Sequence, residues 1–332
     1  MNRGRSVLAA VLAAVLAVPC GLAPAAAGPA AFAQAWPVKP IGIVVTYAPG
    51  GGADAMARLL APKLSQELGQ PVTVENKPGG SGQIGASQVA KSPPDGYTLM
   101  LDASSYAVNP ALFPKLSYDT EKAFRPIGIV ALFPNVILVT PAFPARTLDE
   151  LIAAAKTTRD GVSYASSGNG SAQHLAGALF GSITHVEMLH MPYKGGGPAL
   201  KDVLSGQVPV LFGNIASTLP YIQDGKLRAL ALTGSRRSAL LPGVPTAAEA
   251  GVKGYEVYEW NVLAAPAHTP DAVVRRISDA LRKALASPEI KARIQALGGE
   301  IVGGTPEAAQ QFVRQQAATW SRVIRERKIT VE

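Results

Sequence analysis

Two glycine-rich turns, each between an apolar strand-like run and a helix-like run, constrain how this chain folds. The first, Gly50-Gly51-Gly52-Ala53-Asp54, follows the run 41–47, and the second, 166–174, follows the run 162–165. At the start of a helix, the first backbone N–H groups lack partners inside the helix and carry partial positive charge. Each turn is therefore a candidate half-site for an anion.

The pattern of apolar residues predicts two successive sets of alternating strands and helices. The first set has strands 41–47, 72–75 and 97–101 with helices 56–68 and 83–91. The second has strands 136–140, 162–165, 186–191, 208–212 and 227–233 with helices 147–156, 172–180 and 198–204. A strand over 255–265 and helices over 271–285, 288–297 and 306–327 follow. This alternation is typical of an α/β fold with mostly parallel sheets flanked by helices.

A chain of 332 residues exceeds one ordinary core, so we expect two α/β lobes. Residues 34–136 with 261–332 are predicted to form lobe 1, and residues 137–260 to form lobe 2. The chain would then cross between the lobes near 135–141 and near 258–265. Two such crossings are typical of a hinge.

The first 33 residues are predicted to be a signal peptide. Arg3 and Arg5 precede an apolar run, 7–18, that is short for a membrane span of about 20 residues. Ala31-Phe32-Ala33 has the small-x-small form of a cleavage site, and residues 25–27 are a second candidate. We expect export to the periplasm after cleavage near Ala33.

Cysteine usage and charge narrow the possible partners. Cys20 is the only cysteine and lies in the predicted signal peptide, where the preceding Pro19 argues against a lipid anchor. The formal net charge of +8 favours encounter with anions. The basic residues are scattered with few aromatic residues between them, which argues against a nucleic-acid partner.

The first glycine turn also matches a dinucleotide-binding pattern, with Gly50 to Ala55 as G-x-G-x-x-A and Glu75 about twenty residues further on. Asp54, however, places a carboxylate where pyrophosphate needs a helix end without negative charge. An exported chain also lacks the cytosolic nicotinamide pool. A nucleotide P-loop is excluded because no Gly-Lys-Ser or Gly-Lys-Thr follows the glycines. We expect no cofactor.

The second turn offers hydroxyl and amide donors from Ser166, Ser167, Asn169 and Ser171, a group that suits a carboxylate. Ser171 is also a candidate helix cap. An exported hydrolase with Ser171 as nucleophile and His174 as base is an alternative. The elbow pattern G-x-S-x-G and an orienting acid are both missing from the sequence. His174 otherwise closes the pocket rim or packs beneath the loop.

His185, Glu187 and His190 suggest a metal site, but alternation along a strand would put His190 on the other face, so we expect no metal. A third glycine turn, 193–198, precedes a helix. It either touches a ligand, meets a partner or simply turns the chain.

Eight segments in a fixed order resemble the Bug-type (TctC-like) substrate-binding proteins of tripartite tricarboxylate transporters. They are 48–58, 74–79, 92–99, 164–174, 192–196, 225–231, 242–246 and 265–270. The order of the segments, more than any one motif, carries the resemblance, which extends over nearly the whole chain after the predicted signal peptide.

The resemblance implies a two-lobed periplasmic-binding-protein (type II, flytrap) fold that closes over a small organic carboxylate. It also implies a receptor without enzymatic activity that passes its ligand to the membrane subunits of a tripartite tricarboxylate-type transporter. A sensor adaptor that presents the same ligand to a receptor is an alternative. We expect a monomer.

The predicted ligand-binding residues come from both turns and from neighbouring segments: Tyr47, Gly51, Gly52, Ala53, Asp54, Ser104, Ser167, Asn169, Ser171, His174 and Asn214, with Trp260 as a further candidate. Three positions depart from the family pattern. Gly213 replaces an acidic residue, Ala53 stands where a hydroxyl is frequent, and Val262 replaces glycine. The first two departures argue against an amine-bearing ligand and favour a less polar dicarboxylate or an aromatic carboxylate.

Overall fold

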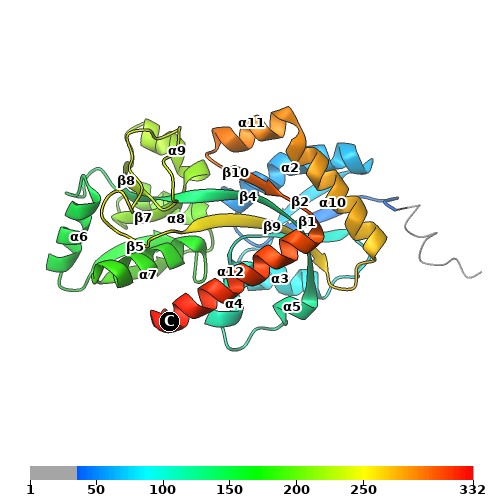
Figure 1. The fold of residues 1–332 in the computed structure, drawn as a ribbon, viewed down its shortest axis with the longest axis horizontal. Coiled ribbons are helices and arrows are strands. Elements are labelled where there is room, and N and C mark those ends of the chain that lie inside the picture. The colour runs from blue at the N-terminus through cyan, green and yellow to red at the C-terminus, as the bar shows by residue number, and fades with distance from the viewer. Residues whose placement is uncertain (1–35, 332) are drawn as a thin grey trace, which may run out of the picture.

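The computed structural model describes residues 36–331, which form an α/β fold around one mixed sheet (Figure 1). The strands are β1 (Ile41–Val45), β2 (Val72–Asn76), β3 (Thr98–Asp102), β4 (Phe124–Val139), β5 (Val162–Ser166), β6 (Met188–Pro192), β7 (Val210–Asn214), β8 (Arg228–Leu232), β9 (Tyr258–Pro266) and β10 (Glu300–Gly303). The predicted α/β class is confirmed. The predicted signal peptide, Cys20 and the cleavage site near Ala33 lie outside the described residues.

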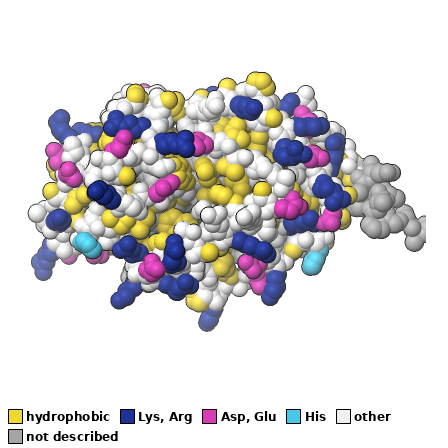
Figure 2. Space-filling view, viewed as in Figure 1, with side chains coloured by type: hydrophobic (Ala, Val, Ile, Leu, Met, Phe, Trp, Pro, Cys, Tyr) yellow, Lys and Arg dark blue, Asp and Glu magenta, His cyan; other side chains and the backbone are white. Residues whose placement is uncertain are grey.

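Helices connect the strands and cover the sheet. They are α2 (Gly52–Leu68), α3 (Gln83–Ala90), α4 (Ser105–Leu112), α5 (Thr120–Ala123), α6 (Leu148–Thr157), α7 (Ala172–Thr184), α8 (Gly196–Leu204), α9 (Ile215–Gln223), α10 (Asp271–Ala286), α11 (Pro288–Ala296) and α12 (Pro306–Glu326). Within residues 36–331, every helix is too short or too polar to traverse a membrane. Lys and Arg side chains are spread over the face drawn in Figure 2.

The sheet order is β2-β1-β3-β9-β4-β7-β5-β6, with β8 and β10 paired to β4. Strands β1, β2 and β3 are mutually parallel, and so are β5, β6 and β7, because a helix connects each strand to the next within these groups. The long strands β4 and β9 pair antiparallel to each other and join the two groups (Figure 1). The sheet is therefore mixed, with a parallel group on each side.

Buried side chains are continuous across this junction. One hydrophobic cluster includes Ile43 of β1, Leu60 of α2, Val136 of β4, Leu211 of β7 and Ile277 of α10. Burying one such side chain contributes about 1.5–3 kcal/mol. The two groups of strands are therefore connected by shared packing as well as by two strands.

Several elements differ from the sequence prediction. The predicted strand 136–140 is the end of the 16-residue strand β4. Pro126 and Pro134 lie in β4, and its register with β9 shifts beside Pro126, which is how a sheet accommodates proline. Helices α4 and α9 each contain a proline, Pro110 and Pro220, and were missed, as were α5 and β10.

Replacing Ile137 of β4 tests the buried packing around this strand. Ile137 is fully buried, so Ile137→Ala is expected to lower the free energy of unfolding by about 2–5 kcal/mol. Ile84 of α3 is 58% exposed, and Ile84→Ala is the matched control, with an expected change of about 0.5 kcal/mol. Urea unfolding measures both values. Equal losses would contradict the assigned core.

Candidate ligand-binding site

A pocket lies where four helices begin. It is lined by Gly52 at the start of α2, Ala172 of α7, Gly196 of α8, and Asn214, the residue that caps α9. These helices follow β1, β5, β6 and β7, so the pocket lies at the carboxyl ends of the parallel strands. Four helix N-termini together provide unpaired N–H groups and partial positive charge, which suit an anion.

The residues that cap the four helices differ in whether a side chain accepts a hydrogen bond from the backbone N–H groups of the first turn. Gly51 caps α2 and Gly195 caps α8, and glycine has no side chain to accept from the first turn. In contrast, Ser171 Oγ accepts from His174 N at 3.2 Å, which confirms its predicted capping role. Asn214 Oδ1 accepts from Ala216 N at 2.8 Å. The N-termini of α2 and α8 therefore offer the freest donors.

The first glycine turn touches the third one directly. Ala48 N donates to Lys194 O at 3.3 Å, and a Cβ added to Gly197 would lie 2.7 Å from Pro49 O. Only a residue without a side chain allows two backbones to approach so closely. The third turn, whose role the sequence left open, thus closes the pocket against the first.

In this structure the pocket has a volume of about 20 Å³, enough for about one water molecule. An adjoining pocket of about 220 Å³ lies between the turn 79–82 and the residues Ser167, Asn169 and Lys194. The structure is therefore closed at the helix N-termini, and a larger solute requires the walls to separate.

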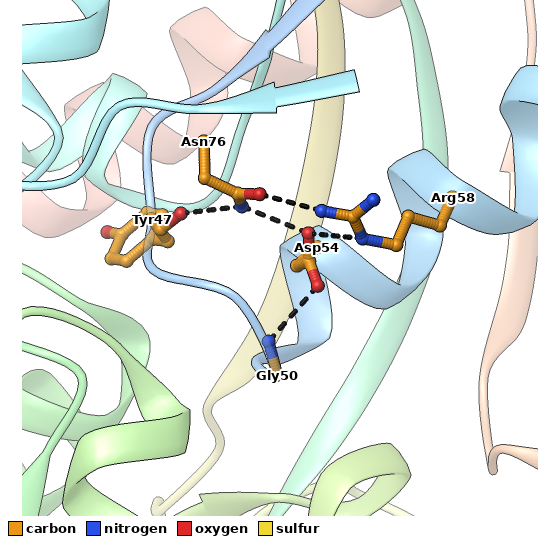
Figure 3. Close-up of polar contacts among 5 residues, drawn as sticks. All are labelled: Tyr47, Gly50, Asp54, Arg58 and Asn76. Carbon is orange, nitrogen blue, oxygen red and sulfur yellow. Dashed lines mark hydrogen bonds and ion pairs between the residues drawn. The ribbon is translucent and has the colours of Figure 1, made fainter. Parts of the chain in front are cut away.

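The Asp54 carboxylate holds the first glycine turn in place through hydrogen bonds. Its Oδ2 accepts from Gly50 N at 3.0 Å, and its Oδ1 accepts from Arg58 Nε at 2.9 Å and from Asn76 Nδ2 at 3.0 Å (Figure 3). Asn76 Nδ2 also donates to Tyr47 O at 2.9 Å. The Asp54 carboxylate thus accepts three hydrogen bonds from its own chain and holds the turn, and its predicted contact with a ligand stays a prediction.

The environment of Asp54 favours its charged form. Burial raises the pKa of this carboxyl, but hydrogen bonds from Gly50 N, Arg58 and Asn76, together with the Arg58 charge, outweigh burial. The pKa of Asp54 therefore lies below its ordinary value.

Most of the predicted residues meet at the pocket, which is lined by Tyr47, Gly51, Gly52, Ala53, Ser167, Ser171 and Asn214. Ser104 and Trp260 lie elsewhere. The Ser104 side chain is buried, with its Oγ 3.4 Å from Trp260 N. The Trp260 ring packs edge-on against Phe312 with ring centroids 5.3 Å apart. Trp260 points away from the pocket because strand side chains alternate.

His174 lies behind the second turn. Its Nδ1 accepts from Gly170 N at 3.1 Å, while the Ser171 hydroxyl donates to Gly168 O at 2.7 Å. Burial lowers the pKa of His174 to about 4. The hydroxyl and the imidazole therefore have separate partners, and this geometry does not support the hydrolase alternative.

The proposed arrangement of His185, Glu187 and His190 on one strand was wrong. His185 ends α7 in a left-handed conformation (φ 56°), and β6 begins only at Met188. His190 stacks on His174 at a centroid distance of 4.1 Å. Within residues 36–331, no group of three His, Cys, Asp or Glu side chains could hold a metal ion.

The sequence analysis missed Thr218 of α9 and two further buried polar residues of the pocket. Gln173 of α7 and Glu259 of β9 both line it and are 3% and 6% exposed. Glu259 is the one charged residue of the largely buried strand β9, which is the signal that could have revealed it. Gln173 has no comparable signal, because a polar residue in the first turn of a helix is ordinary.

This mixed α/β fold, with helix N-termini converging on a pocket between two groups of strands, is that of a periplasmic binding protein. The chain belongs to the family described as the tripartite tricarboxylate transporter family receptor (TctC), whose model matches residues 56–329. The predicted family resemblance is thereby confirmed.

Three solved structures illustrate the similarity. The periplasmic binding protein BugD is 36% identical with a TM-score of 0.86, covering 90% of this chain and 100% of that chain. Rpa4515 from R. palustris, with adipate, is 35% identical with a TM-score of 0.86 and coverages of 89% and 99%. MatC from Rhodopseudomonas palustris, with bound malate, is 32% identical with a TM-score of 0.83 and coverages of 87% and 100%.

The Asp54 network predicts a pH-dependent effect of Asp54→Asn. The pKa of Asp54 is lower in the folded than in the unfolded protein, so its contribution to stability is present above about pH 4 and is lost as pH falls through the folded pKa. At pH 7 the variant is expected to be about 1–3 kcal/mol less stable than wild type. Denaturant unfolding from pH 7 to pH 2.5 should show this difference shrinking; a constant difference would contradict the network.

Proposed function

We propose that this protein is an exported receptor that binds a small organic carboxylate and delivers it to the membrane subunits of a tripartite tricarboxylate-type transporter. The convergence of four helix N-termini on one pocket carries the proposal, because their N–H groups are suited to a carboxylate. The related proteins with adipate and malate support this ligand class. Signal-peptide cleavage near Ala33 is part of the proposal.

The carboxylate is proposed to bind between the first and third glycine turns. The N–H groups of Gly52 and Ala53 approach from one side, and that of Gly196 and the hydroxyl of Ser167 approach from the other. Tyr47 also lines the pocket. Hydrogen bonds to a charged acceptor are stronger than neutral ones, so these donors favour an anion over a neutral solute.

The domain division belongs to this proposal. Residues 34–136 with 261–332 form lobe 1, residues 137–260 form lobe 2, and β4 with β9 acts as the hinge. The contact between Ala48 and Lys194 then joins the lobes in the closed form. Ligand favours closure because it contacts both walls only when they meet.

A thermal-shift screen of mono-, di- and tricarboxylates tests the ligand class. A ligand at about one hundred times its dissociation constant should raise the free energy of unfolding by about 2.7 kcal/mol, which raises the melting temperature. Sugars and nucleotides serve as controls and should have no effect. A shift with a sugar or a nucleotide but with none of the carboxylates would refute the proposal.

Gly197→Ala tests closure. The added Cβ would meet Pro49 O at 2.7 Å, so closure should be impeded and carboxylate affinity should fall at least tenfold. Gly243→Ala is the matched control, because its Cβ would have nothing within 4 Å. Calorimetric titration measures affinity, and the melting temperature without ligand reports folding. Unchanged affinity in a folded Gly197→Ala protein would exclude this contact from closure.

A further inference from the structure

Glu259 places a carboxyl group in the wall of the pocket. Its side chain is 6% exposed and lies on the face of β9 opposite to that of Trp260. Glu259 Oε2 accepts from Gln173 Nε2 at 2.5 Å, and the same Nε2 donates to Asn135 Oδ1 at 3.0 Å. The carboxyl group is therefore held by an amide that is itself fixed from a second side.

The other carboxyl oxygen borders the start of α2. A Cβ added to Gly52 would lie 2.8 Å from Glu259 Oε1 and 2.9 Å from Asn214 Nδ2. Both polar atoms thus lie beside the same small space, next to the first N–H groups of α2. A ligand bound at those N–H groups would have Glu259 Oε1 as a close neighbour.

The described residues that line the pocket provide no positive charge to pair with the Glu259 carboxylate. Among the described residues that line it, none is Lys, Arg or His, and the groups facing Glu259 are the amides of Gln173 and Asn214 and the phenol of Tyr47. Burial raises the pKa of Glu259, although the two amides oppose the shift. Burying a carboxylate without a cation costs free energy, because the charge loses its contact with water. A positively charged group on the ligand would offset that desolvation penalty.

We propose that Glu259 determines specificity by pairing with a protonated amine on the ligand, so that the site selects amino carboxylates over the corresponding unaminated acids. This inference rests on the carboxylate-binding function proposed above. The ligand carboxylate lies at the N-termini of α2 and α8, and the ammonium group lies at Glu259 Oε1. Glu259 of β9 would thus supply the acidic group that the chain lacks at Gly213 of β7. The expectation that this chain disfavours an amine-bearing ligand is then reversed.

Matched pairs of acids test the proposal on the purified protein. Calorimetric titration compares L-aspartate with succinate, L-glutamate with glutarate, and L-leucine with 4-methylpentanoate. The aminated member of at least one pair should bind at least tenfold more tightly than its partner. Stronger binding of the unaminated member in every pair that binds would overturn the proposal, because Glu259 would then act as a protonated donor to an acid.

Glu259→Gln provides the second measurement, since it keeps the shape and removes the charge. The variant should lose at least tenfold in affinity for the aminated acid while affinity for the unaminated acid is kept or increased. Without ligand it should melt no lower than wild type, because a buried charge is removed. Unchanged preference in a folded variant would overturn the role of Glu259.

Different outcomes of these titrations separate the amine specificity from the carboxylate-binding function. Binding of unaminated acids alone would overturn the amine specificity and leave the carboxylate receptor intact. If none of the mono-, di- and tricarboxylates of the thermal-shift screen binds, aminated or not, while a sugar or a nucleotide does, the carboxylate receptor itself is refuted, and the specificity of Glu259 with it.

Discussion

The contact between two glycine turns is the constraint on which the pocket depends. Pro49 and Gly197 come so close that a single Cβ would collide, and this proximity brings the N-terminus of α2 opposite that of α8. Helix N-termini act on an anion only over short distances, since their partial charge falls off within the first turn. A pocket lined by backbone donors therefore needs walls whose backbones can nearly touch, and glycine permits this.

Asp54 and Glu259 are both buried acids near the pocket, and their surroundings give them opposite properties. Asp54 receives three hydrogen bonds, one of them from Arg58, and its pKa is lowered. Glu259 has amides as neighbours, and its pKa is raised. The chain thus satisfies the acid that shapes the turn and leaves the acid in the pocket wall without a cation. This contrast is why a structural role fits the first and a ligand-directed role fits the second.

The mixed sheet explains how these groups come together. β4 and β9 carry Asn135 and Glu259 between the two parallel groups, and Gln173 of α7 bonds to both residues. The polar end of the pocket is therefore built on the strands that join the two sides. Two hydrogen bonds of Gln173 thus connect the pocket wall to both joining strands.

The sequence by itself determined the α/β class, the two strand–glycine–helix junctions, the Ser171 cap and the family. Each of these features follows from neighbouring residues or from the order of motifs, so it can be predicted without knowing any long-range contact. The full length of β4 was missed because Pro126 and Pro134 interrupt the local pattern. The sheet accommodates Pro126 beside a register shift, and Pro134 pairs with Tyr258 near the start of β9.

Only the tertiary structure decided which of the candidate residues line the pocket and which further residues join them. Asp54 bonds to the backbone of its own turn, and Trp260 packs in the core beside Phe312. Glu259 lines the pocket from β9, which lies far along the chain from either turn. Strand alternation shows that Glu259 and Trp260 face opposite ways, but which face meets the helix N-termini depends on how β9 pairs with β3 and β4. That pairing joins residues more than a hundred positions apart, which a local pattern does not encode.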